Sequence, residues 1–430
     1  MKKVSKPEVV TPERASGADL PEAVQDALGE LSGVGLGVVS ELMAAEVDQV
    51  VGPKGRHDPK RSATRHGTEN GSLTLGGRRV GVERPRMRSA DGSSEVPVRT
   101  YEHFADRDPL TRMVFERILA GVSTRNYERV GEPVGSEVVS KAGSESKSSV
   151  SREFISRTRT ALGELMARRL DDVRLAAMML DGLEISGKVH VVALGISTAG
   201  EKLPLGLWEG SSENATVARA LLSDLVDRGL DPEQGILFVI DGAKALRKAI
   251  GDVFGQRAPV QRCVRHKERN VLGHRDDQTS KIVKSRLRGA WALEDHRLAL
   301  ERLKVLEREL AQSDPSAAAS LREGMEETLT VQRLGASERL RKSLASTNPC
   351  ESMIEIVRRT QKNVKRWQGG DMRIRWTAAG MLEAERQFRK IVGYGDLGDL
   401  AVAIEREVSR SLCSPPPAAS REEVAETAYW

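Results

Sequence analysis

The order of apolar and amphipathic segments between residues 172 and 270 constrains the fold of this chain more than any other feature. Short runs of apolar residues bounded by turn residues predict strands, and an apolar stripe at helical spacing predicts a helix. In chain order these segments are strands at 175–180, 189–196 and 203–208, a helix at 214–228, a strand at 236–240, a helix at 243–250 and a strand at 260–263. The order β-β-β-α-β-α-β predicts a hairpin meander followed by crossovers into parallel strands.

This order is typical of a ribonuclease H-like core in an α/β fold. Two acidic residues occupy equivalent places in it. Asp181 follows Met-Met-Leu and Asp241 follows Phe-Val-Ile, and a glycine comes directly after each. Carboxylates at the carboxyl ends of buried strands face the crevice beyond the sheet. We therefore expect Asp181 and Asp241 to converge there.

A third carboxylate is expected from a helix. The sequence Ser-Thr-Asn-Pro-Cys-Glu-Ser over 346–352 predicts a helix start, with Thr347 or Asn348 as the cap, Pro349 at its first position and Glu351 in its first turn. The positive end of the helix dipole favours an ionised carboxylate there.

Asp181, Asp241 and Glu351 together predict a site for Mg²⁺ or Mn²⁺, two ions in all, because carboxylate oxygens are the ligands these ions prefer. Two such ions suit in-line phosphoryl transfer, with water or a 3′-hydroxyl as the nucleophile. Taken singly, an Asp-Gly after a strand more often marks a turn, and a Glu at a helix start is usually a surface residue. The combination in this order carries the prediction.

Basic residues cluster on both sides of this acidic trio. The segment 53–90 holds ten basic and three acidic residues, a net charge of +7, and a second basic group follows Glu351. Such clusters are often solvated surfaces, but here they favour contact with a phosphate backbone. The candidate DNA contacts are Arg78, Arg79, Arg84, Arg86, Arg88, Lys365, Arg366 and Trp367.

The region ahead of the core predicts small DNA-binding elements. Strands at 72–75 and 79–83 around Gly76-Gly77 predict a hairpin, with extended chain over 84–88. Three helices with short turns then resemble a helix-turn-helix reader, the third capped by Ser148-Ser149 and beginning near Val150. The alternative is an ordinary three-helix bundle.

The apolar run lengths and the cysteine count limit the class of protein to which this chain can belong. No apolar run reaches 18 residues, which argues against a membrane partner and predicts a cytoplasmic, nucleoid-associated location. Three cysteines are too few for a disulfide framework. The expected organisation is a tail and helix (1–50), a basic β-containing segment (51–105), a helical DNA-binding region (106–171), the first part of the core (172–274), a helical insertion (275–340), the C-terminal helical part of the core (341–395) and a tail (396–430).

The chain resembles the Mutator-type transposases of bacterial insertion sequences, within the DDE transposase superfamily. The resemblance runs from about residue 55 to 395. It rests on Asp181-Gly182, the stretch 239–246, the Gln-Arg-Cys-Val-Arg-His-Lys segment 261–267, the segment 346–352 and Val-Lys-Arg-Trp over 364–367.

The resemblance implies that Asp181, Asp241 and Glu351 are the metal-binding triad, and that the segment between His266 and Glu351 is an all-helical insertion. It also implies a substrate of double-stranded DNA, both element ends and target, and a homodimer or larger assembly. Cys263 and His266 would be the Cys-x-x-His pair of the family. A zinc site would need more ligands, from His274, Cys350 or distant groups; otherwise Cys263 packs in the core and His266 supports the site.

The predicted function is binding of terminal inverted repeats with metal-dependent cleavage and strand transfer. One alternative is a transposase-derived regulator that binds DNA without cutting it. Another is a ribonuclease H-like nuclease without strand transfer. Trp291 and Trp367 are candidates to stack on bases or wedge DNA ends, and the alternative for Trp291 is a place in the core of the helical insertion.

Overall fold

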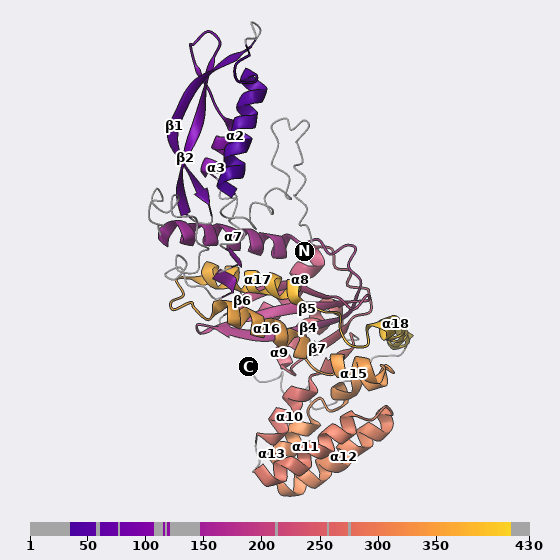
Figure 1. Ribbon diagram of the computed structural model, residues 1–430. Coiled ribbons are helices and arrows are strands. Elements are labelled where there is room, and N and C mark those ends of the chain that lie inside the picture. Colours follow the sequence, from indigo (N-terminus) through magenta and orange to yellow (C-terminus); the bar gives the residue numbers. More distant parts are fainter. Residues whose placement is uncertain are drawn as a thin grey trace, which may run out of the picture. The chain divides into compact units, whose positions relative to one another are not determined.

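The computed structural model describes residues 35–56, 61–75, 78–106, 115–116, 118–120, 147–210, 214–255, 258–273 and 277–413. The chain divides into two compact units, residues 1–156 and 157–430, and the boundary falls within helix α7 (Lys147–Ala167). The structure is mixed α/β, with two separate sheets (Figure 1). Within the described residues no helix is both long and apolar enough to cross a membrane.

The first unit is built on a long hairpin. Its elements are α2 (Gly35–Val51), β1 (Ala63–Leu75), β2 (Arg78–Ser89), β3 (Glu95–Val96) and α3 (Arg99–Asp106), and its sheet order is β1-β2-β3. The two helices bury Val39, Met43 and Phe104 against Leu73 and Met87 of the hairpin.

The hairpin prediction is confirmed, but both strands are longer than predicted. Pro85 lies within β2, where a residue without an N–H would weaken a regular ladder. It pairs with Thr68, and the register of β1 shifts between Arg65 and Thr68. This irregularity accommodates the proline, so pairing continues through residues 84–88. The expected turn at Gly76-Gly77 lies outside the described residues.

The helical region expected over 106–171 is described only in part. The described part of helix α7 starts at Lys147 and already includes Ser148 and Ser149, which the sequence predicted as its cap. The predicted helices near 110–119 and after Ser123-Thr124 fall mostly outside the described residues. The first half of the helix expected at 21–50 also lies outside them.

The second unit contains the expected β-β-β-α-β-α-β order. Its elements there are β4 (Leu175–Ile185), β5 (Lys188–Ser197), β6 (Lys202–Gly210), α8 (Ala215–Asp227), β7 (Leu237–Ile240), α9 (Lys244–Phe254) and β8 (Val260–Arg262). The sheet order is β6-β5-β4-β7-β8. The β6-β5-β4 portion is antiparallel, and β4, β7 and β8 run parallel.

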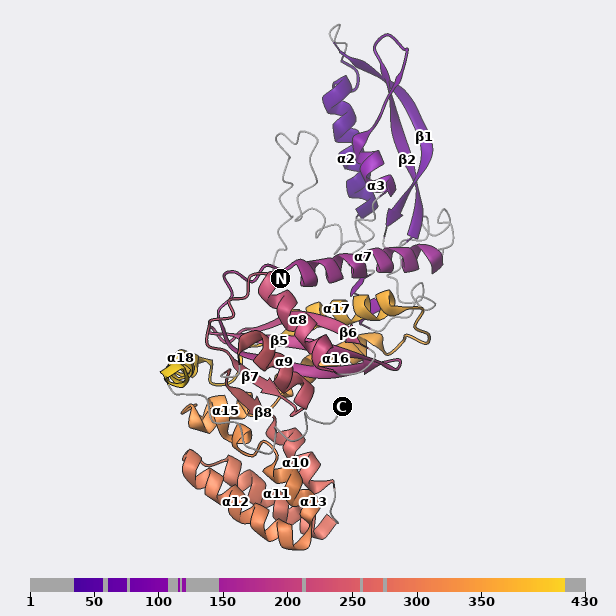
Figure 2. The same cartoon turned by 180° about the vertical axis from the view of Figure 1, so that it is seen from behind.

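Helices cover both faces of this sheet, as Figures 1 and 2 show from opposite sides. Helices α8 and α9 pack with Leu180, Phe238 and Ile240 on one face. Helices α16 (Asn348–Gln361) and α17 (Gly370–Gln387) cover the other face, where Met179 and Val239 are buried.

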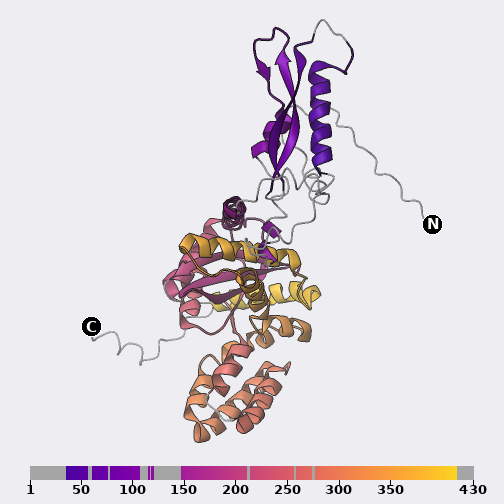
Figure 3. The same ribbon diagram turned by 60° about the vertical axis from the view of Figure 1, so that its left-hand side comes forward.

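A helical block lies between β8 and α16, at one end of the unit (Figure 3). Its elements are α10 (Val264–Leu272), α11 (Asp277–Trp291), α12 (His296–Ser313), α13 (Pro315–Arg322), η1 (Glu326–Leu329), α14 (Thr330–Arg333) and α15 (Glu338–Leu344). The predicted break near Pro315 is confirmed, because α12 ends at Ser313. Leu298 differs from the expected apolar stripe, since it is exposed. After α17 come η2 (Tyr394–Asp396) and α18 (Leu397–Cys413).

Trp291 belongs to the core of this block. Its side chain is 9% exposed, and its indole N–H donates to Thr328 Oγ1 at 3.1 Å. We expect Trp291→Phe to lower the free energy of unfolding by about 1–2 kcal/mol, because the buried hydroxyl loses its donor. Chemical denaturation would measure this. Trp208→Phe is the control, because Trp208 is exposed; equal losses in both variants would contradict the prediction.

Candidate active site

Asp181 lies within a strand, not at its end, so the predicted strand boundary is wrong. Strand β4 continues to Ile185, because its antiparallel pairing with β5 extends past Asp181, which is opposite Val192. The parallel pairing with β7, by contrast, stops at Met179. Asp181 therefore lies just beyond the end of its shorter neighbour, and Gly182 forms no turn. The Gly182 N–H donates to Asp181 Oδ1 at 2.9 Å.

Asp241 follows β7 directly, as predicted. Strand β7 ends at Ile240, and Gly242 adopts a positive φ of 111°, which redirects the chain toward α9. The Ala243 N–H donates to Asp241 Oδ1 at 2.9 Å and restrains the carboxylate.

Strand alternation places both aspartates on one face of the sheet. Side chains two residues apart point the same way. Met179 and Leu183, which flank Asp181, are buried on the face covered by α16 and α17, and so is Val239, two residues before Asp241. The carboxylates of Asp181 and Asp241 therefore share the face on which α16 packs.

Glu351 comes from the first turn of α16, as predicted. Thr347 occupies the cap position, and Pro349 is the second residue of the helix rather than the first. The Thr347 side chain makes no capping bond to the backbone. Its hydroxyl lies instead 3.3 Å from Glu351 Oε1 and 3.5 Å from Cys263 Sγ, and can donate to one of them at a time.

The three carboxylates interact electrostatically. The pKa of Asp181 is raised to about 6, mainly by burial and to a smaller extent by the charges of Asp241 and Glu351, against the lowering effects of the Gly182 N–H and His266. Asp181 is only 8% exposed. A buried carboxyl beside two further carboxylates has an excess of negative charge, which a divalent cation would neutralise. The donor set consists of oxygens and fits Mg²⁺ or Mn²⁺.

An imidazole and a guanidinium of α10 contact Glu351. His266 Nε2 lies 3.8 Å and an Arg269 guanidinium nitrogen 3.6 Å from Glu351 Oε1. The sequence analysis named His266 but missed Arg269. The signal for Arg269 was its spacing, because residues three apart share a helix face. It becomes informative only once Glu351 is placed beside α10.

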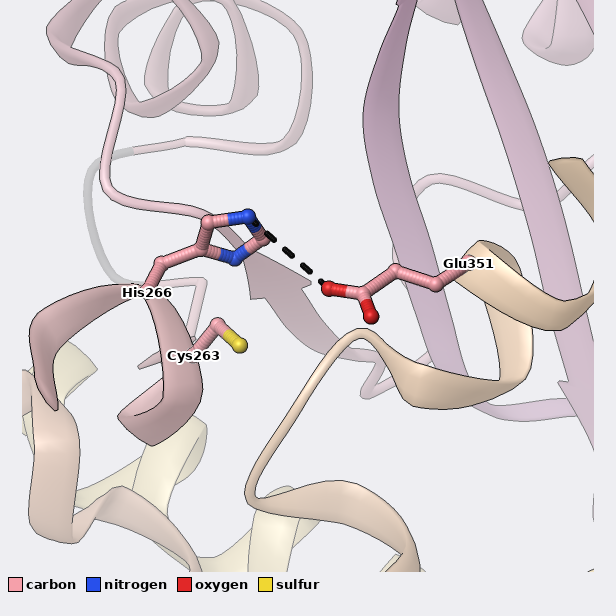
Figure 4. A group of neighbouring side chains, drawn as sticks. All are labelled: Cys263, His266 and Glu351. Carbon is pink, nitrogen blue, oxygen red and sulfur yellow. Dashed lines mark ion pairs between the residues drawn. The ribbon is translucent and has the colours of Figure 1, made fainter. Parts of the chain in front are cut away.

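Cys263 is buried at the start of α10, and its N–H donates to Ile240 O at 2.7 Å. The expectation that it packs in the core is confirmed. Cys263, His266 and Glu351 each present one potential ligand atom within 4.8 Å of the others (Figure 4). Cys350 is buried too but is not part of this group, and His274 lies outside the described residues.

The predicted DNA contacts of the first unit differ in their surroundings. Arg84 donates to Glu69 at 2.6 Å and stacks on Tyr101, with 4.8 Å from guanidinium to ring centroid. Arg86 makes two 3.0 Å bonds to Glu95. Arg88 is exposed. Arg78 and Arg79 belong to β2, but their side chains lie outside the described set.

The predicted contacts of the second unit lie between α16 and α17. Lys365 and Arg366 are exposed, whereas Trp367 is half-buried and packs against the sheet core. Lys365 and Arg366 thus present their charges to solvent, and Trp367 anchors the segment that carries them.

The family profile described as "Transposase, Mutator family" matches residues 13–390, which include every carboxylate of the site. The chain belongs to the Mutator family of transposases. The resemblance seen in the sequence is therefore confirmed.

Transposases for insertion sequence elements of several bacteria align with the chain. The transposase for insertion sequence element ISRM3 of Rhizobium meliloti is 26% identical over 207 residues, 48% of this chain and 50% of the relative. The transposase for IS1081 of Mycobacterium tuberculosis is 28% identical over 244 residues, 54% and 56% of the two chains. The transposase for IS406 of Burkholderia multivorans is 26% identical over 341 residues, 77% and 81%. The chain spans about half of the ISRM3 and IS1081 relatives it matches.

Proposed function

We propose that this Mutator-family protein is a DDE-type transposase that binds the terminal inverted repeats of an insertion sequence and cuts and joins DNA at Asp181, Asp241 and Glu351. The observation that carries the proposal is that Asp181 and Asp241 share the sheet face on which α16 packs, and that α16 carries Glu351 in its first turn. The three carboxylates come from segments far apart in the sequence, yet Asp181 interacts electrostatically with both others. The sheet order and strand directions support a ribonuclease H-like core.

Asp181, Asp241 and Glu351 would hold Mg²⁺ or Mn²⁺, in all two ions. When bound, such ions supply the positive charge that activates an attacking oxygen and stabilises the leaving one. The chain's own groups prepare the site. The N–H groups of Gly182 and Ala243 hold the aspartates, and Thr347, His266 and Arg269 orient Glu351. Asp181 carries a proton below about pH 6, which must leave before its carboxylate holds a cation.

The proposal also assigns roles to the other parts of the chain. Residues 172–274 and 341–395 form the catalytic core, and 275–340 form a helical insertion. Residues 51–105 and 106–171 bind the DNA ends. Because two ends must be joined in one reaction, a homodimer or larger assembly on double-stranded DNA is part of the proposal.

The test is an assay of the purified protein with Mg²⁺ or Mn²⁺ on DNA that carries the element's own ends. Products that are both cut and joined to target DNA are the expected result. Cleavage without joining would replace the proposal with a nuclease. End binding without any cleavage would replace it with a regulator.

DNA binding by the segment after α16 should depend steeply on salt. We expect Lys365→Ala and Arg366→Ala each to weaken binding for all sequences alike and to reduce the slope of log affinity against log salt by about 1, because each phosphate contact releases counterions. Fluorescence titration at several salt concentrations would measure the slope. Lys342→Ala is the control, because Lys342 pairs with Glu338 on α15. An unchanged slope in both test variants would exclude the segment as a phosphate contact.

A further inference from the structure

A thiol, an imidazole and a carboxylate meet where α10 and α16 begin. Cys263 precedes α10, His266 lies in its first turn, and Glu351 faces them from α16 (Figure 4). One ligand atom from each lies within 4.8 Å of the others. In a tetrahedral zinc site, bonds of about 2.0–2.3 Å place neighbouring ligand atoms roughly 3.5 Å apart. Small side-chain rotations would therefore bring the three groups onto one ion.

The surroundings of Cys263 favour the thiolate, the form that binds metals. The Thr347 N–H donates to Cys263 Sγ at 3.4 Å, with the Thr347 hydroxyl at 3.5 Å. Burial raises the pKa of Cys263, but the neighbouring His266 and the Thr347 donors outweigh it and lower that pKa. Burial raises the pKa of Cys350 well above its usual value. The two cysteines are thus chemically distinct.

A ring nitrogen of His266 is available to bind a metal ion. Its Nδ1 is buried and makes no hydrogen bond of ordinary geometry within the described part of the chain, and the imidazole interacts electrostatically with the Cys263 thiol. Arg269 also contacts Glu351, but its side chain is 66% exposed and can move into solvent when a cation arrives. Three protein ligands and one open position are a common zinc arrangement.

We propose that Cys263, His266 and Glu351 form a binding site for Zn²⁺, and that Zn²⁺ bound there inhibits the enzyme by holding Glu351 away from the catalytic ions. Sulfur and imidazole ligands select Zn²⁺ over Mg²⁺. Glu351 Oε1 is the atom that already faces His266 and Thr347. Zn²⁺ would retain the carboxylate there and add positive charge beside Asp181. Only the inhibitory effect rests on the proposed function.

The site is tested without DNA. The full-length protein, stripped of metal, is titrated with Co²⁺, which takes zinc sites and reports sulfur ligation by a near-ultraviolet charge-transfer band. We expect the band to saturate at one sulfur-bound Co²⁺ per chain, and Zn²⁺ to displace that ion. Cys263→Ser should abolish the band, and His266→Gln should weaken Zn²⁺ binding by at least about 100-fold, since even outer-shell substitutions cost 10–100-fold. Cys350→Ser is the matched control and should keep the band.

Absence of the band in the unmutated protein, or its loss in Cys350→Ser with retention in Cys263→Ser, would overturn the site. The inhibitory effect is tested by adding Zn²⁺ to Mg²⁺-dependent cleavage. Each variant is compared with its own rate without Zn²⁺, and Cys263→Ser should be resistant. Equal inhibition of that variant would place Zn²⁺ at the aspartates and overturn the effect. A cobalt band in a protein that cuts no DNA would support the site and refute the proposed function.

Discussion

Alanine at Asp181, Asp241 or Glu351 is expected to lower the rate of Mg²⁺-dependent strand cleavage by roughly 10³-fold or more, because each change would remove one of the proposed ligands of the charge-stabilising cations. Binding of the DNA ends should persist, since none of the three belongs to the basic segments. Single-turnover cleavage and end binding, measured in parallel on the same substrate, would separate the two effects.

Two neighbouring glutamates provide matched controls for these variants. Glu184 lies on β4 three residues after Asp181, and Glu355 lies on α16 one turn after Glu351, and both are exposed. Glu184→Ala and Glu355→Ala should cleave at rates within a few-fold of the unmutated protein. If Glu351→Ala stayed active and Glu355→Ala did not, the third ligand would be Glu355. Retained cleavage in either aspartate variant would refute the assigned site.

Asp181→Asn is expected to stabilise the metal-free protein by about 2–3 kcal/mol at pH 7.5. The pKa of Asp181 in the folded protein is about 6, above the value of about 3.9 in an unfolded chain. A raised carboxyl pKa means that the folded state favours the neutral form, so stability falls as pH rises from about 4 to 6 and stays low above that range. Asparagine removes this cost because it carries no charge.

Denaturant unfolding at several pH values, with chelator present, would measure this gain. The gap between Asp181→Asn and the unmutated protein should open between pH 4 and 6 and remain constant above. Mg²⁺ should then stabilise the unmutated protein more than the variant, because it binds the carboxylate. Glu184→Gln controls for loss of a charge on the same strand and should change little. A destabilised Asp181→Asn protein at pH 7.5 would mean that the carboxylate has a stabilising partner.

The order of strands and helices in the second unit was predictable from the sequence, because apolar runs and an amphipathic stripe are local patterns. Asn214, predicted at the start of a helix, accepts the Val217 N–H as the cap of α8. The strand ends were less predictable. The apolar run 175–180 is followed by the charged Asp181, which indicated the end of a strand. Strand β4 nevertheless continues to Ile185, because hydrogen bonds to β5 set its length and a local pattern carries no information about that partner strand.

The surroundings of charged side chains were also not predictable. From the sequence, Arg84 and Arg86 were predicted to contact DNA. In the fold, Arg84 pairs with Glu69 and Arg86 pairs with Glu95. Lys267 in the Cys-x-x-His segment is buried, and its ammonium donates to Ser320 O and Glu323 O at 2.6 Å. Burial lowers its pKa to about 8. Such contacts depend on which distant segments pack together.

By itself the sequence predicted the kind of chemistry to test: it pointed to three carboxylates, each tied to a recognisable local element, and to a Cys-x-x-His pair. The tertiary structure alone decided that Asp181 and Asp241 share the face covered by α16, and that Glu351 also lies beside Cys263 and His266. The physical reason is distance along the chain. Local patterns set backbone conformation, but only packing of the sheet against α10 and α16 brings His266 and Arg269, which precede Glu351 by 85 and 82 positions, within reach of its carboxylate.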